Sequence, residues 1–325
     1  MYKCMRRALL IGINDYPSSP LEGCIDDVNM LQKALIRNGD DTSNFAVKTL
    51  INPTSIDEIR EPLSLLFRDD SDMALFYFSG HGCNTPLGAS MVFPGKDGEY
   101  EVFYLSELMK TVNESKAKNK IIILDSCYAG FLGRESIEDS TSIISPGVSI
   151  LTACREDETA LEAGGHGLFT ELLCSGLNGG AADFNGNITI GSLYAYIDRS
   201  LGPWSQRPIF KTNITEFKAI KRVIPKVPLS TIRELVNLFS SYDEIHRLNP
   251  SYEFTNNPEY SHSVIEPYTI DENVDRFKQL QSLASIGFVE PISEDHMYFE
   301  AMNNGGCRLT ELGKHYWRLV KSDIL

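Results

Sequence analysis

A thiol and an imidazole occupy two similar places in this sequence, each just after a short apolar segment and close to a glycine. Cys127 lies in Asp125–Gly130 (DSCYAG), and His81 lies in Ser79–Gly82 (SGHG). The thiolate is the nucleophilic form of cysteine, and a free thiol with a pKa of about 8.5 is mostly protonated at neutral pH. An imidazole that takes this proton creates a reactive site. The pair therefore predicts nucleophilic catalysis, with Cys127 as the nucleophile and His81 as its general base.

The glycines next to these residues predict where a developing negative charge would be stabilised. A glycine lets the backbone come close to a substrate carbonyl, so the N–H groups of Gly82 and of Cys127 itself are the expected oxyanion donors. One such donor is worth roughly 3 to 4 kcal/mol in the transition state.

The segments around the two residues alternate between strand and helix patterns. Short apolar runs typical of fully buried strands occupy residues 7–12, 73–78, 121–124 and 148–152. Helical patterns occupy residues 26–37, 55–67, 104–112 and 168–177. This alternation predicts an α/β fold with a mainly parallel sheet covered by helices on both sides. Such sheets place reactive residues just past the carboxyl ends of their strands, where His81 and Cys127 both fall.

Seven motifs in one order carry a resemblance to a known clan. They are Ala8–Asn14 (ALLIGIN), Leu21–Val28 (LEGCIDDV), Tyr77–Gly82 (YFSGHG), Leu124–Gly130 (LDSCYAG), Ile150–Cys154 (ILTAC), Gly165–Thr170 (GHGLFT) and Gly186–Ile190 (GNITI). With these motifs, residues 5–215 resemble the caspase, paracaspase and metacaspase clan of cysteine peptidases, in particular its bacterial metacaspase-type members. The order also fits, because caspases carry the histidine about 50 residues before the cysteine. The resemblance implies a caspase-like fold and a cysteine endopeptidase.

The resemblance also assigns the residues that select the substrate. It implies that Asp27 and Asp125 form the floor of the site for the residue before the scissile bond, with Ser79 lining it. Two carboxylates in a partly desolvated site favour a cation, so cleavage after Arg or Lys is expected. Asp27 can instead be a first-turn residue that complements a helix dipole, with Asp26 competing for either role. Asp125 can instead be an orienting or turn residue.

Three alternatives stand beside the catalytic prediction. Cys127 can be a buried structural cysteine, and His81 a core or turn histidine. A second Gly-His-Gly at Gly165–Gly167 makes His166 a rival base, although it follows the cysteine and stands before a predicted helix, which favours a loop or helix-start role. An exposed polar loop is predicted over residues 131–146, and it makes Arg134 a candidate for self-cleavage.

Cofactor signals are weak. The seven cysteines contain no CxxC pair, which argues against zinc and against a secreted disulfide framework. Asp97, Glu99 and Glu101 match no EF-hand spacing, and Asp183 opens a turn before a strand. No metal or other cofactor is predicted, with calcium kept as an alternative because metacaspases often depend on it.

The chain after the two prolines of residues 221–228 changes pattern, which predicts two domains, residues 1–222 and 223–325. The second domain resembles a small, mostly α winged-helix module. Its predicted elements are helices near 230–239 and 274–286, a hairpin over 297–306 and a helix near 310–320. Residues 226–325 hold nine lysines and arginines against fifteen aspartates and glutamates. A DNA-binding winged helix needs a basic face, so protein docking or autoinhibition is the expected role.

The net charge of −14 makes nucleic acid and anionic lipid unfavourable partners. Without a signal-peptide core or a membrane-length apolar run, we expect a cytoplasmic protein. The expected partners are protein substrates with accessible Arg or Lys and a protein activator or adaptor bound by the second domain. By resemblance, the protein is an effector protease of bacterial stress response, cell death or antiviral defence. The other hypotheses are a catalytically silent adaptor and a winged-helix regulator.

Overall fold

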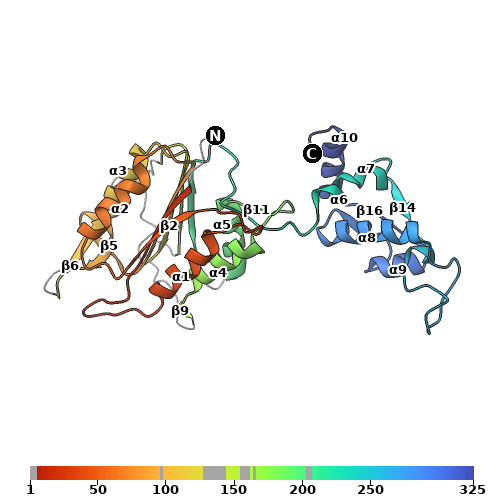
Figure 1. Ribbon diagram of the computed structural model, residues 1–325, viewed down its shortest axis with the longest axis horizontal. Coiled ribbons are helices and arrows are strands. Elements are labelled where there is room, and N and C mark those ends of the chain that lie inside the picture. Colours follow the sequence, from red (N-terminus) through yellow and green to blue (C-terminus); the bar gives the residue numbers. More distant parts are fainter. Residues whose placement is uncertain (1–5, 96–97, 127–143, 154–161, 164–165, 203–206) are drawn as a thin grey trace. The chain divides into compact units, whose positions relative to one another are not determined.

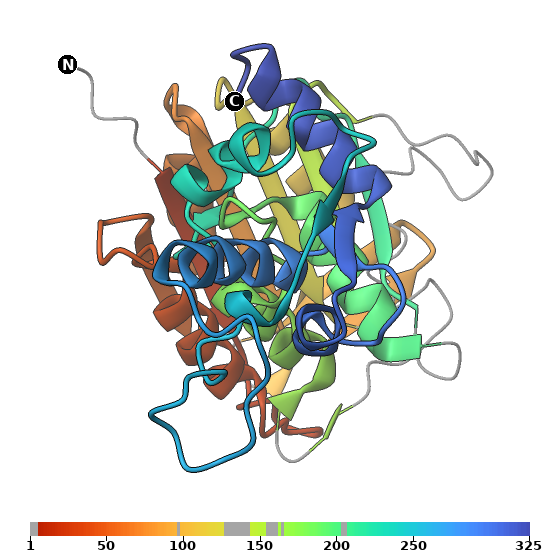
Figure 2. The same ribbon diagram turned by 90° about the vertical axis from the view of Figure 1, so that its right-hand side faces the viewer.

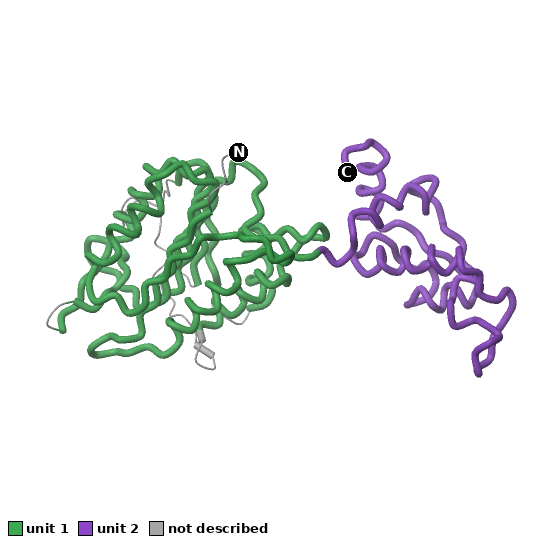
Figure 3. Tube along the Cα trace, in the orientation of Figure 1, with its two compact units in different colours: residues 1–224 green, residues 225–325 purple. Residues whose placement is uncertain are grey.

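The chain folds into two compact units. The computed structural model describes residues 6–95, 98–126, 144–153, 162–163, 166–202 and 207–325. Unit 1 spans residues 1–224 and unit 2 residues 225–325 (Figure 3). This division lies two residues after the predicted boundary. Strand β13 (Lys221–Arg222) pairs with β11 (Asn187–Ile188) of unit 1, and Val223 beyond it donates its N–H to the carbonyl of Gly186. The first residues of the predicted linker are therefore part of the first unit.

Unit 1 is built on a six-stranded sheet with the order β12-β8-β7-β3-β1-β2. Its strands are β1 (Arg6–Gly12), β2 (Ala46–Ile51), β3 (Met73–Ser79), β7 (Asn119–Asp125), β8 (Val148–Thr152) and β12 (Ile209–Thr212). All neighbouring strands are parallel except β12, which runs antiparallel to β8. The predicted mainly parallel α/β architecture is confirmed.

Helices cover both faces of this sheet (Figure 1). On one face, α2 (Asp57–Arg68) and α3 (Leu105–Glu114) pack on every second residue of the strands, such as Phe76 and Phe78 of β3. The other face is covered by α1 (Cys24–Leu35), α4 (Leu168–Ser175) and α5 (Ile190–Leu201). Alternate strand residues point to opposite faces, so Tyr77, Ser79 and Asp125 project toward α1 and α4.

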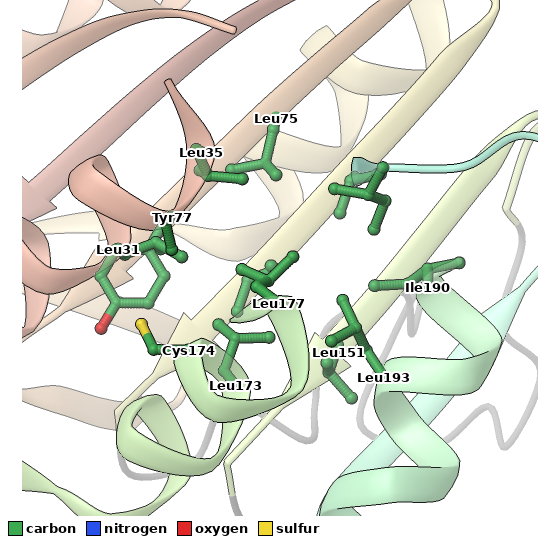
Figure 4. Packing of buried hydrophobic residues seen from close by; sticks show 14 of the residues in the cluster. Leu31, Leu35, Leu75, Tyr77, Leu151, Leu173, Cys174, Leu177, Ile190 and Leu193 are labelled. Carbon is green, nitrogen blue, oxygen red and sulfur yellow. The ribbon is translucent and has the colours of Figure 1, made fainter. Parts of the chain in front are cut away.

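The packing on this second face holds α1 and α4 in place over β3. Leucines from α1, α4 and α5 meet Leu75 and Tyr77 of β3 and Leu151 of β8 (Figure 4). These side chains are almost fully buried, and a well-packed interior resists displacement of the elements that form it. The cluster therefore fixes the two helices that carry Asp27 and Thr170.

Smaller elements complete unit 1. A second sheet contains β4 (Gly82–Thr85), β5 (Gly88–Pro94) and β6 (Tyr100–Tyr104), and β4 begins immediately after His81. Before α4, β9 (Glu162–Ala163) pairs with β10 (His166–Gly167). Helix α4 ends at Ser175 and continues as a π-helical turn, η3 (Gly176–Gly180).

Unit 2 combines short helices with a three-stranded antiparallel sheet, β14-β16-β15. Its elements are α6 (Leu229–Arg233), α7 (Leu235–Leu238), β14 (Ile245–Arg247), η5 (Pro250–Tyr252), α8 (Asp271–Ser285), β15 (Val289–Pro291), α9 (Met297–Met302), β16 (Gly306–Leu309) and α10 (Glu311–Lys321). Three of the four predicted elements are found, with the first helix broken at Glu234. The winged-helix identity of this unit stays a prediction.

The predicted hairpin over residues 297–306 is wrong. Residues Met297–Met302 form helix α9, and β16 pairs with β15 on the other side of that helix. The reason is Glu300, whose fully buried carboxylate accepts hydrogen bonds from the backbone before α9 and after it. Among the described helices of both units, none has the length and apolar character needed to cross a membrane.

Candidate active site

The carboxyl ends of β3 and β7 bring the two predicted catalytic segments to one edge of the sheet. These strands are parallel neighbours, and Ser79 is in register with Asp125. The backbone N–H of Gly80 donates to the carbonyl of Asp125 at 3.4 Å, which continues the contact past the strand ends. His81 is the second residue after Ser79, and Cys127 is the second residue after Asp125. Cys127 itself lies outside the described residues, as does Arg134.

The ring of His81 is held by a backbone carbonyl. Its Nε2 lies 2.7 Å from the carbonyl oxygen of Ser19, and its ring packs on that of Tyr16 with the centroids 4.5 Å apart. A carbonyl oxygen can only accept a hydrogen bond, so Nε2 carries a proton. In the neutral ring, Nδ1 is then the nitrogen able to accept a proton.

The hydroxyl of Tyr16 joins His81 to the small sheet. It accepts a hydrogen bond from the backbone N–H of His81 at 2.9 Å and donates one to the carbonyl of Val92 at 3.0 Å. Val92 N–H in turn donates to the carbonyl of His81 at 2.9 Å. Burial raises the pKa of Tyr16 well above its usual value, against a smaller lowering by the His81 N–H. The phenol therefore keeps the proton that it gives to Val92.

The backbone N–H of Gly82 points away from its sheet. Gly82 pairs with Met91, one position after the hydrogen-bonded pair of His81 and Val92. Because bonding in an antiparallel ladder alternates, the N–H of Gly82 is directed away from β5. Since β4 is an outer strand of the β4-β5-β6 sheet, this N–H lies on the open side. The predicted oxyanion role needs an N–H that the β4–β5 ladder does not use, and that of Gly82 meets this condition.

Two buried carboxylates meet next to this edge. Asp27 on α1 is 2% exposed and Asp125 at the end of β7 is 7% exposed. A Cβ built on Gly167 would lie 2.6 Å from Oδ2 of Asp125 and 3.2 Å from Oδ2 of Asp27. The two oxygens are therefore no farther apart than the sum of those distances. Asp26, the alternative candidate, is exposed on the other side of α1.

Each carboxylate is oriented by hydroxyl and backbone donors. Asp27 accepts from Ser79 Oγ at 3.1 Å and from the N–H of Gly167 at 3.3 Å. Thr170 Oγ1 donates to Oδ2 of Asp125 at 2.7 Å. Only glycine fits at position 167, because a Cβ there would collide with the Asp125 oxygen. Ser79, Asp27 and Asp125 thus come together as predicted, and Gly167 and Thr170 join them.

A buried chain of hydroxyls extends behind Asp125. The hydroxyl of Tyr77 lies 2.7 Å from Oγ1 of Thr170, and neither side chain is exposed. Thr170 has one hydroxyl proton, which it gives to Asp125, so Tyr77 must be the donor to Thr170. Burial, followed by the charges of Asp125 and Asp27, raises the pKa of Tyr77 well above its usual value. Tyr77 thus stays protonated and holds Thr170 in place.

The described cysteines near this site differ from a catalytic thiol. Burial, with a further contribution from the Asp27 carboxylate, raises the pKa of Cys174 to about 12. Cys24 on α1 is buried as well, and so is Cys307 of unit 2. Burial also raises the pKa of Cys83, which is partly exposed on β4. A raised pKa keeps a thiol protonated and inert.

The remaining candidates from the sequence have structural surroundings of their own. The backbone of His166 pairs with Ala163 just before α4 begins at Leu168. Asp183 accepts hydrogen bonds from the N–H groups of Asn185 and Asn187, as expected for the turn that opens β11. Glu101 accepts from the N–H of Ile56. Asp97 lies outside the described residues, and among those described no cluster of three or more His, Cys, Asp or Glu is arranged to hold a metal ion.

Several residues of this site had no assigned role in the sequence. Tyr77 is hidden in an apolar strand, and Ser19 contributes only a backbone carbonyl, 62 positions from His81. Gly167 and Thr170 lie in a motif that carried the resemblance (GHGLFT), which was the available signal. Tyr16 follows β1 closely, as the reactive residues follow β3 and β7, and that position was its only sign.

Comparisons with known proteins agree with this architecture. A family model described as the caspase domain matches residues 5–219. Metacaspase-8 of Arabidopsis thaliana is 31% identical over 157 residues, which cover 40% of this chain and 38% of that protein. The chain thus spans well under half the length of that relative.

Solved structures show the likeness of fold. The crystal structure of caspase-1 from Spodoptera frugiperda matches with a TM-score of 0.50 at 17% identity, covering 68% of this chain and 91% of that one. Protein GSU0716 from Geobacter sulfurreducens has a TM-score of 0.49 at 18% identity, covering 68% of this chain and 98% of that one. The match to the insect caspase confirms the predicted caspase-like fold of unit 1.

Proposed function

Because this chain belongs to the caspase-domain family, we propose that it is a cysteine endopeptidase that cleaves proteins after Arg or Lys. Cys127 is the nucleophile and His81 the general base. The observation that carries the proposal is the meeting of Asp27 and Asp125 around Gly167, at the sheet edge where β3 leads to His81 and β7 leads to Cys127.

The proton transfers follow from the bonds of His81. With Nε2–H given to the Ser19 carbonyl, Nδ1 takes the thiol proton of Cys127. The thiolate attacks the peptide carbonyl, and the N–H groups of Gly82 and Cys127 donate to the oxyanion. The C–N bond then breaks as His81 returns the proton to the leaving amine. Water, deprotonated by His81, hydrolyses the thioester and restores the thiol.

The preference for Arg or Lys follows from the two carboxylates. Both are buried and fixed by donors from β3, the N-terminus of α4 and α4 itself. A guanidinium can bond to two carboxylates at once, and an ammonium gains the same attraction as a point charge. A substrate aspartate would instead be repelled, since like charges in a desolvated site are strongly unfavourable.

Two further parts of the proposal come from the sequence resemblance. Cleavage after Arg134 would separate the two segments of unit 1 and mature the enzyme. The biological role would be that of a regulated effector in bacterial stress response, cell death or antiviral defence, switched on by a protein partner of unit 2.

The test is cleavage of matched fluorogenic peptides with Arg, Lys or Asp before the scissile bond. Wild type and Cys127→Ala are compared, with calcium and with a chelator. Turnover of Arg or Lys peptides that Cys127→Ala abolishes is the expected result. Turnover of the Asp peptide would contradict the roles of Asp27 and Asp125. A folded protein without turnover under every condition, before and after incubation with cell extract, would favour the adaptor instead.

A further inference from the structure

Unit 2 presents an unusual concentration of exposed apolar side chains on one ordered loop. The loop, residues 253–271, connects η5 to α8 and extends from the body of the unit (Figures 1 and 2). Its exposed large apolar residues, with exposures from 41% to 56%, are Phe254, Tyr260, Ile265, Tyr268 and Ile270. Exposed apolar side chains that gather in one segment mark a binding site more often than single exposed residues do.

The loop is held in one conformation by Asn256. This side chain is 2% exposed, and the two hydrogens on its Nδ2 are shared among the carbonyls of Pro250, Ile265 and Pro267. Its Oδ1 accepts from the N–H of Ile265 at 2.9 Å. An asparagine that bonds to both arms of a loop holds the two arms at a fixed distance. The exposed apolar side chains are therefore presented in a fixed arrangement.

The two arms also lie side by side near the body of the unit. Thr269 Oγ1 donates to the carbonyl of Glu253 at 2.8 Å, and Thr269 N–H donates to that of Asn256 at 3.1 Å. Tyr268 and Ile270 flank Thr269 in the chain, and both are exposed. Phe254 follows Glu253 directly. These three residues form the neck of the loop, and their fixed backbone lowers the entropy lost when a partner binds.

The charges of the loop identify the kind of partner. Between Arg247 and Arg276 the sequence contains no lysine or arginine. Exposed carboxylates stand next to the apolar residues in the chain: Glu259 precedes Tyr260, Glu266 follows Ile265, and Asp271 follows Ile270. Such a surface complements cations that surround apolar side chains, and it repels nucleic acid and anionic lipid. Because the net charge of the whole chain is −14, a second copy of this acidic chain is also a poor match.

We propose that the 253–271 loop docks a basic, amphipathic segment of a partner protein. Where that protein is also the substrate, docking holds it near unit 1 and raises its effective concentration there, whatever the arrangement of the two units. This second part rests on the proposed function, whereas the docking itself does not.

Binding is tested on the full chain carrying Cys127→Ala, which cannot cleave its ligand. The probes are two 18-residue fluorescein-labelled peptides with the same helical pattern of leucines, one with lysines and one with glutamates at the other positions. We expect anisotropy to show binding of the lysine peptide alone, weakened by added salt. Replacement of the neck residues (Phe254→Ser, Tyr268→Ser, Ile270→Ser) should weaken it at least about 10-fold, as expected for central apolar contacts.

The matched control replaces Leu312 and Ile324 by Ser, because both are exposed apolar residues of unit 2 outside the loop. This variant should bind as before. Failure of the lysine peptide to bind, equal binding of the glutamate peptide, or equal losses in both variants would overturn the proposal. So would a dimer in sedimentation that only the neck variant dissociates, since the occupant would then be a second copy. Thermal unfolding checks that both variants are folded.

The recruitment step is tested separately with the active enzyme. An Arg-containing cleavage site is joined to the lysine peptide and compared with the short site alone. The neck variant should raise KM for the joined substrate about 10-fold and leave the short one unchanged. If neither substrate is cleaved while binding persists, the proposed function fails and the docking stands. An equal KM for both substrates in wild type would overturn recruitment.

Discussion

Buried carboxylates occur in both units, but they are held in opposite ways. In unit 2, Glu300 is fully buried and accepts from the backbone N–H groups of residues 292, 293, 294 and 306, all within eight positions of it. In unit 1, Asp27 and Asp125 are held by Ser79, Gly167 and Thr170, which come from distant parts of the chain. Donors that are close in sequence, as around Glu300, make a carboxylate part of the local fold. Donors from several distant elements, as around Asp27 and Asp125, place a charge at a chosen position.

This difference predicts that charge removal will affect function in one unit and stability in the other. If the two kinds of site do not differ, charge removal will change activity and stability together in both units.

The largest effect is expected for the aspartates of unit 1. Asp125→Asn and Asp27→Asn should each lower kcat/KM for an Arg peptide about 100-fold, because loss of one partner of a buried charge pair weakens binding by about 2 to 5 kcal/mol. The melting temperature should fall little, since each change also removes repulsion between the two carboxylates. Steady-state kinetics and thermal unfolding measure the two quantities. Asp26→Asn, an exposed neighbour on α1, is the matched control and should leave both unchanged.

The opposite result is expected for Glu300→Gln. An amide offers one acceptor oxygen in place of two, so buried N–H groups lose partners at a cost of about 1 to 3 kcal/mol each. Unit 2 should unfold at a lower temperature, which is measured by the fluorescence of the buried Trp317. Cleavage of a short Arg peptide should be unchanged. Glu290→Gln, which alters an exposed ion pair with Arg308, is the control. Unchanged stability in Glu300→Gln would remove the contrast between the units.

Glu300 also gives unit 2 a dependence on acid. Burial raises the pKa of this carboxyl, but the backbone bonds from Ser293, Gly306, Glu294 and Ile292 together outweigh burial, so its pKa is lowered in the folded state. A lowered folded pKa means that the stabilisation is fully present above the unfolded value of about 4.5 and is lost as pH falls below it. Glu300→Gln should flatten this part of the stability curve, measured by urea unfolding between pH 3 and 6.

A smaller effect is expected for Thr170, which acts through Asp125. Thr170→Val removes the Thr170 donor from Asp125 and the Thr170 acceptor from Tyr77. We expect kcat/KM for an Arg peptide to fall about 10-fold, since the loss of a buried hydrogen-bond partner costs about 1 to 3 kcal/mol. The change should appear in KM more than in kcat, because the residue positions a binding group. Thr170→Ser keeps the hydroxyl and should restore KM. Equal losses in both variants would mean that packing, and not the hydrogen bond, matters.

The smallest effect is expected for Tyr16→Phe. The ring still packs on His81, but the hydroxyl that links His81 N–H to Val92 is lost, which is worth about 1 kcal/mol. We expect kcat to fall about 3- to 5-fold with KM unchanged. Tyr100→Phe, whose hydroxyl accepts from Ser18 N–H nearby, is the control. Because Tyr16 is neutral over the whole working range, its loss should leave the pH profile of kcat unshifted.

The predictable part of the fold is the part with the strongest burial. Strands β1, β3, β7 and β8 read as apolar runs because both of their faces are covered by helices. Strand β2 lies at an edge with alternate residues exposed, and β12 has polar residues among its four, so neither gave an apolar run. Helix α9 was missed because its position depends on the buried charge of Glu300, which looks like an ordinary surface residue in the sequence.

The order of the residues alone indicates which chemical groups this protein has: Cys127 and His81 after buried strands, acidic residues near both, and a second unit of acidic composition. Tertiary structure decided which of these groups meet. The register of β3 with β7 sets Ser79 beside Asp125, the rotation of α1 turns Asp27 inward and Asp26 outward, and Ser19 decides which nitrogen of His81 is protonated. Each depends on contacts between residues far apart in the chain, which the packing of the two sheet faces brings within hydrogen-bonding distance.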